Sequence, residues 1–437
     1  MAPVTTQADA DIDLPDSPTG RAAAWFIENV RRLGDGLTAD EVRARMVFRE
    51  PWDPANSIER FRSSDPRPFR VATIKEPSPS TITVRLEYGD DRPFSVTLDV
   101  EPEPPHRITW VWWGRAIDDD ITIRQADAAD APALNQLEVR APMTLGTSTL
   151  VYDRGRDFLA FSRLMEENVC FVAERDGELL GLACGAGHDC RVGGEIHRVM
   201  LLHHLRVPVE HRKEGIFSTL NGYVFATYEG RSDAAYGYTA IENEEAMRIG
   251  GPGTWRAGVW RAIVPCEPNA GPAHGRAATP ADAPEIVAIL NECHDREEMY
   301  LPYSVESLTA RLERAPDLYT WGNVLVGDGA VLGVWPAGLR VTIDDGTHTT
   351  VSTRAVTLDH GFVPGAEAEL ERLLGAVCSA LLARGHTELM FLTSEGSPHH
   401  GLIQRVASKL DPFAFRMGVP EPEGTTERGL YVDPVYF

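Results

Sequence analysis

The sequence contains few cysteines, almost no lysine and no long apolar run. Its six cysteines form neither a CxxC pair nor another spacing typical of metal ligands, so we expect no zinc site and no disulfide framework. No apolar run approaches the ~20 residues that span a bilayer. The N-terminal residues are acidic and lack the basic start and apolar stretch of a signal peptide. We predict a cytoplasmic protein with free thiols, no metal, no membrane association and a disordered tail over residues 1–18.

The charge of the chain is strongly acidic. It has 65 acidic and 42 basic residues, a formal net charge of -23, and its only lysines are Lys75, Lys213 and Lys409. Such a surface repels phosphate backbones, which argues against nucleic acid as the main partner. It attracts a cationic small molecule, although an excess of one charge also serves solubility alone. The sequence leaves open whether the protein is a monomer or a homodimer.

Length and composition predict about three domains. A prior of roughly 100–200 residues per domain gives that number for 437 residues. Two seams stand out: residues 117–120, which contain three successive aspartates, and a stretch over 266–282 rich in proline, glycine and alanine. The predicted domains are therefore 19–118, 119–268 and 278–437.

The first domain begins with two helical patterns, over 22–33 and 38–47, the second with Thr38 as its cap and Glu41 three residues later. Four runs with partial alternation of apolar and polar residues then predict strands. Helices followed by a curved antiparallel sheet resemble the NTF2-like or cystatin-like α+β domains. Trp110, Trp112 and Trp113 are expected in the core or at an interface.

The sequence of the middle domain predicts alternating strands and helices. We expect a strand over 121–127, helices over 130–139 and 157–167, and a hairpin over 168–187 with an Asp-Gly turn. A strand ending at Val207 is followed by the basic loop Arg212–Gly215 and a helix that begins near Ile216. Strands over 234–243 and 255–268 complete the domain.

The strand, basic loop and helix start form a predicted anion site. A glycine lets the backbone approach a ligand closely, and the unpaired N–H groups and dipole of a helix N-terminus favour negative charge. The loop lacks both the Walker and the GxGxxG patterns. Its spacing resembles the pyrophosphate loop Q/R-x-x-G-x-G/A of the GNAT N-acyltransferases, in which Arg212 and Gly215 match and Phe217 replaces the last small residue. Asn243 begins a segment similar to the family's N-x-x-A motif.

The last domain repeats the same order of elements. The helix over 282–292 begins Asp-Ala-Pro, as does the helix over 130–139, and a hairpin, strand, loop and helix follow over 319–385. Its loop over 359–365 has no arginine and carries Asp359, which disfavours a phosphate. The predicted fold class is therefore α/β (α+β): two GNAT folds in tandem with mixed central sheets, the second degenerate, preceded by a small α+β domain with a curved antiparallel sheet.

The resemblance implies acyl transfer from acetyl-CoA or another acyl-CoA by direct attack of an amine on the thioester. Such a site must orient both reactants, remove a proton and stabilise an oxyanion. The backbone near Leu205 is implied to contact the acyl carbonyl, and that around Val207 the pantetheine. The full set of implied cofactor-binding residues is Leu205, Arg206, Val207, Arg212, Lys213, Glu214, Gly215, Ile216, Phe217 and Asn243.

The general base and acid remain open at this stage. Strand alternation places His203 on the face of Leu201 and His204 on the other face, and an imidazole pKa near 6.5 suits a base. Glu195 and His197 are alternatives upstream, and Tyr238 and Tyr236 are candidate acids on the next strand. Each of these residues is also compatible with a packing role. In one tandem GNAT branch, the Eis-like aminoglycoside acetyltransferases, the C-terminal carboxylate is the base, which is a further alternative here.

We expect the acceptor to be an amine of a small, cationic metabolite or natural product, as in secondary metabolism or antibiotic modification. Two alternatives stay open. The same fold could use an aminoacyl-tRNA or carrier-protein donor, or it could serve a non-catalytic protein that senses CoA or another ligand.

Overall fold

The computed structural model describes residues 12–47, 54–64, 66–89, 93–243, 255–268, 274–419, 421–422 and 428–436. These residues form two compact units. Unit 1 comprises residues 1–123, 173–175 and 210–229, and unit 2 comprises residues 124–172, 176–209 and 230–437. Within the described ranges, no helix is both long and apolar enough to cross a membrane.

The first part of unit 1 comprises helices α1 to α3 and an antiparallel sheet in the order β1-β2-β3-β4. Thr38 caps the second helix by accepting from the N–H of Glu41, as its sequence predicts. Inward side chains of the central strands alternate with half-buried ones. The bounds are α1 Pro18–Arg31, α2 Ala39–Arg45, α3 Pro54–Arg62, β1 Arg70–Ser78, β2 Thr81–Glu87, β3 Phe94–Val100 and β4 Ile108–Arg115.

Helix α5 (Ile216–Tyr228) belongs to unit 1 and packs against β4. The Trp112 indole stacks on the Phe225 ring with centroids 5.9 Å apart. A Cβ atom at Gly222 would lie 2.9 Å from Trp112 Nε1, so the helix needs a glycine where it meets the indole. Trp112 thus lies at the interface of β4 with α5, whereas Trp113 packs on Phe26 against the core of unit 1; core and interface are the two roles that the sequence predicts.

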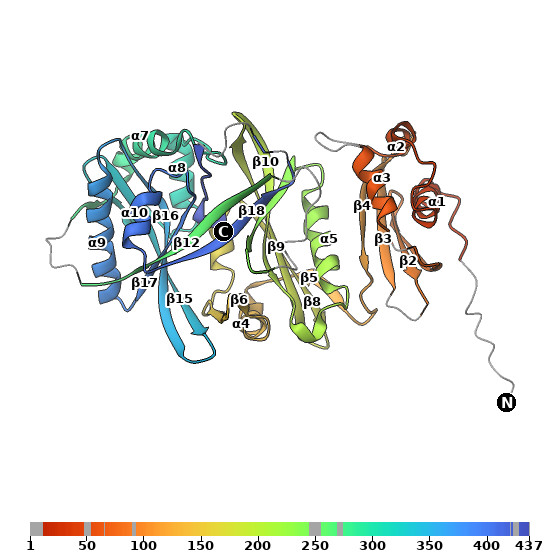
Figure 1. The fold of residues 1–437 in the computed structure, drawn as a ribbon, viewed down its shortest axis with the longest axis horizontal. Coiled ribbons are helices and arrows are strands. Elements are labelled where there is room, and N and C mark those ends of the chain that lie inside the picture. The colour runs from red at the N-terminus through yellow and green to blue at the C-terminus, as the bar shows by residue number, and fades with distance from the viewer. Residues whose placement is uncertain are drawn as a thin grey trace. The chain divides into compact units, whose positions relative to one another are not determined.

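Unit 2 is built on one mixed sheet of 14 strands (Figure 1). The main path runs β13-β14-β15-β16-β17-β12-β18-β11-β10-β9-β8-β5, and β7 pairs with β15 and β6 off this path. The strands are β5 Thr122–Gln125, β6 Met143–Leu145, β7 Ser148–Asp153, β8 Glu167–Arg175, β9 Glu178–Val192, β10 Glu195–Arg206, β11 Ala234–Ala240, β12 Trp255–Pro265, β13 Arg276–Ala277, β14 Val324–Val326, β15 Ala330–Asp344, β16 Thr349–Phe362, β17 Glu388–Thr393 and β18 Lys409–Met417. The helices are α4 Ala131–Arg140, α7 Ala283–His294, α8 Val305–Glu313, α9 Glu367–Ala383 and α10 His400–Val406. The predicted mixed α/β class is confirmed.

Corresponding parts of the middle and last segments share local structure. Arg124 donates to both carboxylate oxygens of Asp130 at 2.8 Å, and Arg276 donates to both oxygens of Asp282 at 2.7 and 2.5 Å. Each aspartate is followed by Ala-Pro and the first turn of a helix. The same arginine-to-aspartate spacing therefore joins a strand to the following helix in both segments.

The two segments are interleaved in the sheet. Strand β18, from the end of the chain, pairs antiparallel with β11 and with β12, and β12 also pairs with β17. Between β12 and β18, buried Arg261 donates to Asp411 at 2.8 Å and to the Tyr152 hydroxyl at 2.5 Å. The last strand of each segment is thus held by the other segment.

One element differs from its expectation. The helix predicted over 157–167 is a short 3-10 helix, Ala160–Leu164, and strand β8 already begins at Glu167. The apolar side chains that suggest a helical stripe divide between two cores, because Phe158 packs with α4 while Leu164 and Met165 pack in the larger cluster of unit 2. Tertiary packing overrides the local pattern here.

Candidate functional site

Strands β10 and β11 run parallel and then diverge. Their ladder comprises Val199↔Ala234, Met200↔Ala235 and Leu201↔Tyr236. After these pairs, β11 continues on β18 and β10 continues on β9. We call the diverging part, residues 202–206 and 237–240, the β10–β11 opening. Beyond the last pair, Leu201↔Tyr236, the backbone groups of the two strands are no longer engaged in this ladder.

A β-bulge lies on the β10 side of the opening. The β9–β10 register shifts between His203↔Cys184 and Arg206↔Leu182. Within the bulge, His204 has φ +49°, in the left-handed region that non-glycine residues seldom adopt. Bulges redirect backbone and side chains and recur beside active sites. The predicted contact of Leu205 with an acyl carbonyl therefore falls on the one distorted part of this strand.

The two histidines of the bulge contact each other. His203 Nδ1 lies 2.7 Å from His204 Nδ1, and Asn168 Nδ2 lies 3.0 Å from His203 Nε2. The Cys170 thiol donates to Asn168 Oδ1, which fixes the amide with its NH₂ group toward His203. His203 Nε2 is therefore an acceptor, its proton is on Nδ1, and it donates to His204 Nδ1. Neither imidazole keeps a free acceptor nitrogen.

Burial makes both imidazoles weak bases. His203 is 7% exposed, and burial, reinforced by the charge of Arg154, lowers its pKa to about 3. Burial and the same arginine lower the pKa of His204 well below its usual value. The rings of Phe158 and Phe161 surround His204. Both histidines are neutral at pH 7.

Arg206 ends β10 in a buried ion triad. Its Nε donates to Glu138 Oε2 at 2.9 Å, and Arg154 approaches the other oxygen of Glu138 at 3.5 Å. Burial works against the charge of Glu138, but the two arginines outweigh it and lower its pKa. Arg206 Nη1 also donates to the carbonyl of Leu205 at 2.9 Å. The side chain of Arg206 thus fixes the backbone of the bulge, and Val207, half-buried, follows it.

The remaining predicted acid and base residues lie at different places. Tyr238 is two residues beyond the last parallel pair, as His203 is on β10, so the two lie on the two arms of the opening. Burial raises the pKa of Tyr238 well above its usual value, and its hydroxyl stays protonated. Glu195 is exposed at the other end of β10, eight residues and roughly 26 Å of strand from His203. His197 is near Asp233, also at that end. The structure does not bring Glu195 or His197 to the opening.

The predicted phosphate loop lies in unit 1. Lys213 and Gly215 both have positive φ, +73° and +83°, and Gly215 is the N-cap of α5 without a side-chain cap. Arg212 and Lys213 are exposed, Ile216 is in the core and Phe217 is 39% exposed. An uncapped helix start beside two exposed cations is suited to an anion.

Gly215 is also required by a contact within the chain. A Cβ atom there would lie 2.3 Å from the Arg115 carbonyl oxygen, so the end of β4 packs directly on the loop. Glu214 approaches His211 at 3.4 Å and Arg175 at 3.8 Å, and Arg175 pairs with Asp118 and Asp120. The sequence motif accounts for Gly215 only by the close approach of a ligand. It does not indicate that the glycine is also needed for the contact with the Arg115 carbonyl.

Asn243 is exposed just after β11, where its N–H donates to the Ala240 carbonyl. The rest of the predicted N-x-x-A segment, 244–246, lies outside the described residues. Among the residues that the structure describes, no cluster of three or more histidine, cysteine or acidic side chains could hold a metal ion.

The corresponding opening in the last segment is filled by protein. Strands β16 and β17 pair over Arg354↔Glu388 to Val356↔Met390, and the β15–β16 register then shifts. Asp359, 1% exposed at this shift, accepts the hydroxyls of Tyr303 and Tyr319 at 3.1 and 2.9 Å. Arg311 donates to the same carboxylate. Asp359, which the sequence analysis expects to disfavour a phosphate, is thus part of a buried polar network.

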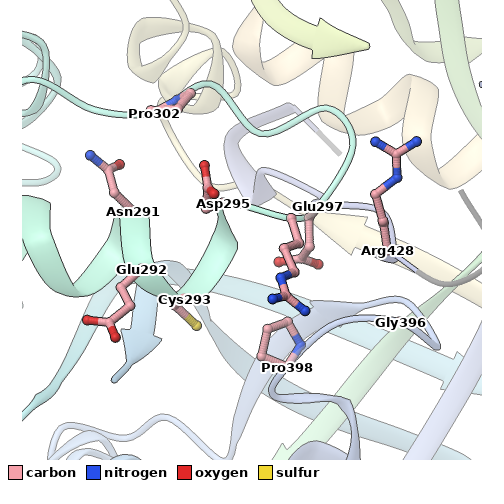
Figure 2. Close-up of a pocket in the computed structure, with 10 residues that line it drawn as sticks. Asn291, Glu292, Cys293, Asp295, Glu297, Pro302, Gly396, Pro398 and Arg428 are labelled. Atoms are coloured by element: carbon pink, nitrogen blue, oxygen red, sulfur yellow. The ribbon is translucent and has the colours of Figure 1, made fainter. Parts of the chain in front are cut away.

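A cavity of about 580 Å³ lies elsewhere in unit 2, at the C-terminal end of α7 (Figure 2). Acidic and basic side chains line this cavity, including those of Glu292, Asp295 and Arg428. None of the residues predicted for acyl transfer lines this cavity.

Comparison with known proteins identifies the fold. No family model and no curated protein matches the sequence. The structure of Saccharomyces cerevisiae N-myristoyltransferase with bound myristoyl-CoA matches with a TM-score of 0.53 and 10% identity, over 76% of this chain and 92% of that one. A second structure of that enzyme, with myristoyl-CoA and inhibitors, matches with a TM-score of 0.52 and 10% identity, over 73% of this chain and 82% of that one. A GCN5-related N-acetyltransferase from Sphaerobacter thermophilus matches with a TM-score of 0.45 and 14% identity, over 71% and 99%. The chain therefore has the fold of N-myristoyltransferase, an acyltransferase fold.

Proposed function

We propose that the protein is an acyl-CoA-dependent N-acyltransferase that transfers an acyl group to an amine by direct attack. The observation that carries this proposal is the β10–β11 opening with its bulge at His204, in a chain with the fold of an enzyme whose structure holds myristoyl-CoA. A thioester placed between diverging strands can receive backbone N–H donors on its carbonyl oxygen, where negative charge develops in the transition state.

The donor is proposed to bind along consecutive parts of the chain. The N–H of Leu205 in the bulge stabilises the acyl oxygen, and the backbone of Arg206 and Val207 pairs with the pantetheine. The pyrophosphate is held by backbone N–H groups at the start of α5, with the exposed cations of Arg212 and Lys213 close in sequence. The remaining proposed donor residues are Glu214, Gly215, Ile216, Phe217 and Asn243.

The structure changes the roles that we propose for the histidines. Because both acceptor nitrogens are engaged and both rings are weak bases, we assign His203 and His204 to holding the bulge rather than to proton removal. Tyr238 keeps a protonated hydroxyl on the opposite arm of the opening. It is the proposed acid for the departing CoA thiolate.

The domain arrangement supports a division of labour. The proposed tandem of GNAT folds uses residues 119–268 for the donor, while the last segment, whose own opening is filled around Asp359, forms a wall of the acceptor site. The N-terminal segment is proposed to be the NTF2-like or cystatin-like domain, and its β4 end packs on the phosphate loop. The net charge of -23 favours a small cationic acceptor.

The test is calorimetric titration of the whole protein with acetyl-CoA and with myristoyl-CoA. A variant carrying Arg212→Ala and Lys213→Ala, which removes the two exposed cations of the loop, is titrated beside it, and a variant carrying Arg276→Ala, which alters an exposed arginine of the last segment, serves as the control. We expect micromolar binding of at least one acyl-CoA by the wild type and the control, and a loss of at least about tenfold in the double variant. Absence of binding by the wild type to both thioesters would refute the CoA-dependent function.

A further inference from the structure

A chain of hydrogen bonds fixes where the proton of the His204 imidazole lies. The Cys170 thiol donates to Asn168 Oδ1 at 3.2 Å, and Asn168 Nδ2 donates to Met165 Sδ at 3.0 Å, so the amide has one orientation. In that orientation Nδ2 also donates to His203 Nε2 at 3.0 Å, and His203 donates from Nδ1 to His204 Nδ1 at 2.7 Å. A neutral imidazole carries a single N–H group. In His204 this group is therefore at Nε2.

The Nε2–H group of His204 is an available donor. Among the contacts of the described residues, His204 has one hydrogen bond, and it uses Nδ1. Nε2 is not among the enclosed polar atoms that lack a partner, and the side chain is half-buried. A polar atom that is neither bonded nor enclosed can be reached by a ligand.

Aromatic rings hold the His204 imidazole in one orientation. The ring centroids of Phe158 and Phe161 lie 6.4 and 6.2 Å from its centroid, and that of His203 lies 4.9 Å away. Phe161 in turn stacks on Trp335 of β15 at 5.8 Å. Because these rings and the bond at Nδ1 fix the imidazole, its Nε2–H group can donate with little rearrangement.

His204 lies directly beside the backbone that we propose contacts the acyl oxygen. The β9–β10 register sets two residues of β10, His204 and Leu205, opposite one residue of β9, Ala183. Such a bulge leaves the extra residue unpaired and redirects side chains. The imidazole donor and the Leu205 N–H therefore come from the two residues that make up the bulge.

The imidazole is a donor that stays neutral. Burial, followed by the charge of Arg154, lowers the pKa of His204 well below its usual value, and the charge of Arg206 acts in the same direction. The ring therefore does not take up a proton at pH 7. A neutral imidazole can polarise a carbonyl through its N–H group.

We propose that His204 is a catalytic residue whose Nε2–H donates to the acyl oxygen, as a second oxyanion donor beside the Leu205 N–H. This inference rests on the proposed acyl transfer. When the amine attacks the thioester carbon, one electron pair of the C=O double bond moves to the oxygen, and the two N–H groups stabilise the charge that develops there. His204 keeps its proton throughout.

The test is isotope-edited infrared spectroscopy of the bound thioester. The probe is acetyl-CoA or myristoyl-CoA, whichever the wild type binds in calorimetry, labelled with ¹³C at the thioester carbonyl. The variants are His204→Asn and His204→Gln, with His348→Asn in the exposed β15–β16 turn as the control. Asparagine tolerates the left-handed backbone and can accept from His203, but it does not reach the position of Nε2. Glutamine can place an amide N–H there.

We expect the carbonyl band of the bound thioester at a lower frequency in the wild type, the control and His204→Gln than in His204→Asn. The affinity of His204→Asn for the thioester should also fall roughly two- to tenfold. A band in the wild type at or above the frequency of the free thioester in water would overturn the proposal, and this comparison needs no variant to fold.

Equal bands in the wild type and His204→Asn would overturn the proposal as well. An equal loss in the asparagine and glutamine variants would do so too, because the bulge and not the N–H group would then account for the shift. Calorimetry separates the two hypotheses. Thioester binding with a band that ignores His204 refutes the role of His204 alone, whereas absence of binding by the wild type refutes the acyltransferase function.

Discussion

Glu138 of α4 accepts a hydrogen bond from Arg206 Nε, at the end of β10, at 2.9 Å. Glu138 is fully buried and also faces Arg154. The pair therefore links the first helix of unit 2 to the backbone that we propose contacts the acyl group.

Substitution Glu138→Gln should destabilise the protein strongly. It keeps the shape of the side chain but leaves two arginines without their counter-charge in the interior, and removal of one partner of a buried pair costs about 3–5 kcal/mol. Urea denaturation measures the loss. Glu178→Gln is the control, because Glu178 pairs with Arg140 at the surface, where such pairs contribute about 0–1 kcal/mol. Equal effects of the two substitutions would contradict the assigned role of the triad.

Gly215→Ala should cost more than Gly177→Ala. The two glycines have nearly the same φ, +83° and +82°, so both alanines pay the left-handed penalty of roughly 1–2 kcal/mol. A Cβ atom at Gly177 meets nothing within 4 Å, whereas at Gly215 it would lie 2.3 Å from the Arg115 carbonyl oxygen. The difference in unfolding free energy between the two variants therefore measures the contact of β4 with the loop. If the two costs agree, this contact does not form in solution.

Gly222→Ala should lower the stability of the wild type but raise the stability of a Trp112→Ala variant. In the wild type, the new methyl group is forced against the Trp112 indole, and overpacking costs about 1–3 kcal/mol. In a Trp112→Ala background that obstacle is gone, and alanine should then stabilise α5 by roughly 0.5–1 kcal/mol over glycine. Thermal unfolding of the four proteins of this double-mutant cycle gives both signs. A stabilising effect in both backgrounds would show that α5 does not pack on Trp112.

Local signals in the sequence are sufficient for much of the fold. The Asp-Gly turn at 176–177 and the apolar runs on either side of it define the β8–β9 hairpin, and the repeated Asp-Ala-Pro starts mark α4 and α7. These features depend on residues close together in the chain. The exchange of β12 and β18 between segments depends on pairs such as Arg261↔Asp411, 150 residues apart, and no local pattern encodes it.

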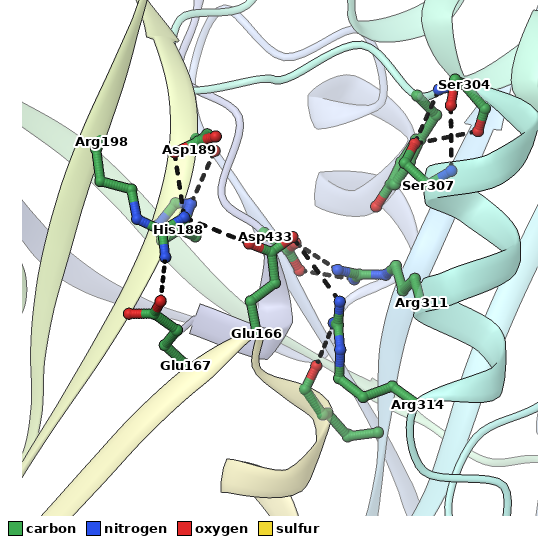
Figure 3. Close-up of polar contacts among 12 residues, drawn as sticks. Glu166, Glu167, His188, Asp189, Arg198, Ser304, Ser307, Arg311, Arg314 and Asp433 are labelled. Carbon is green, nitrogen blue, oxygen red and sulfur yellow. Dashed lines mark hydrogen bonds and ion pairs between the residues drawn. The ribbon is translucent and has the colours of Figure 1, made fainter.

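In the candidate site, too, some features follow from a short stretch of sequence, whereas others depend on residues that are distant in the chain. Arg212 and Gly215 follow from the motif, which is a property of a short stretch. The bulge at His204 was not predicted, because strand alternation assumes a regular strand and the register shifts between His203 and Arg206. The loss of basicity at His203 depends on Asn168 and on burial, which alternation cannot reveal. Arg311 and Asp433 are paired although they come from distant parts of the chain (Figure 3), and no local pattern encodes that pairing.

Burial of neutral histidines should make the protein lose stability as the pH falls from 7 to 5. Burial lowers the pKa of His203 to about 3 and those of His188 and His399 to about 4. The unfolded chain, with pKa near 6.5, binds protons in this range that the folded protein does not, so the free energy of unfolding falls with pH. Each such histidine contributes about 2 kcal/mol of loss between pH 7 and pH 5.

Substitution His188→Gln isolates one of these contributions. Glutamine retains groups that can bond to the Tyr236 hydroxyl and to the Asp189 carbonyl, which are both partners of His188, but it does not titrate. Urea denaturation at pH 7, 6 and 5 should therefore give the variant a shallower pH dependence than the wild type, by about 2 kcal/mol over the range. His294 has a raised pKa and acts with the opposite sign, but it is present in both proteins and cancels in the comparison. Parallel pH dependences would mean that His188 has the same pKa in the folded and the unfolded chain. Its imidazole would then become protonated in the folded protein as the pH falls to 5, and the depressed pKa would be wrong.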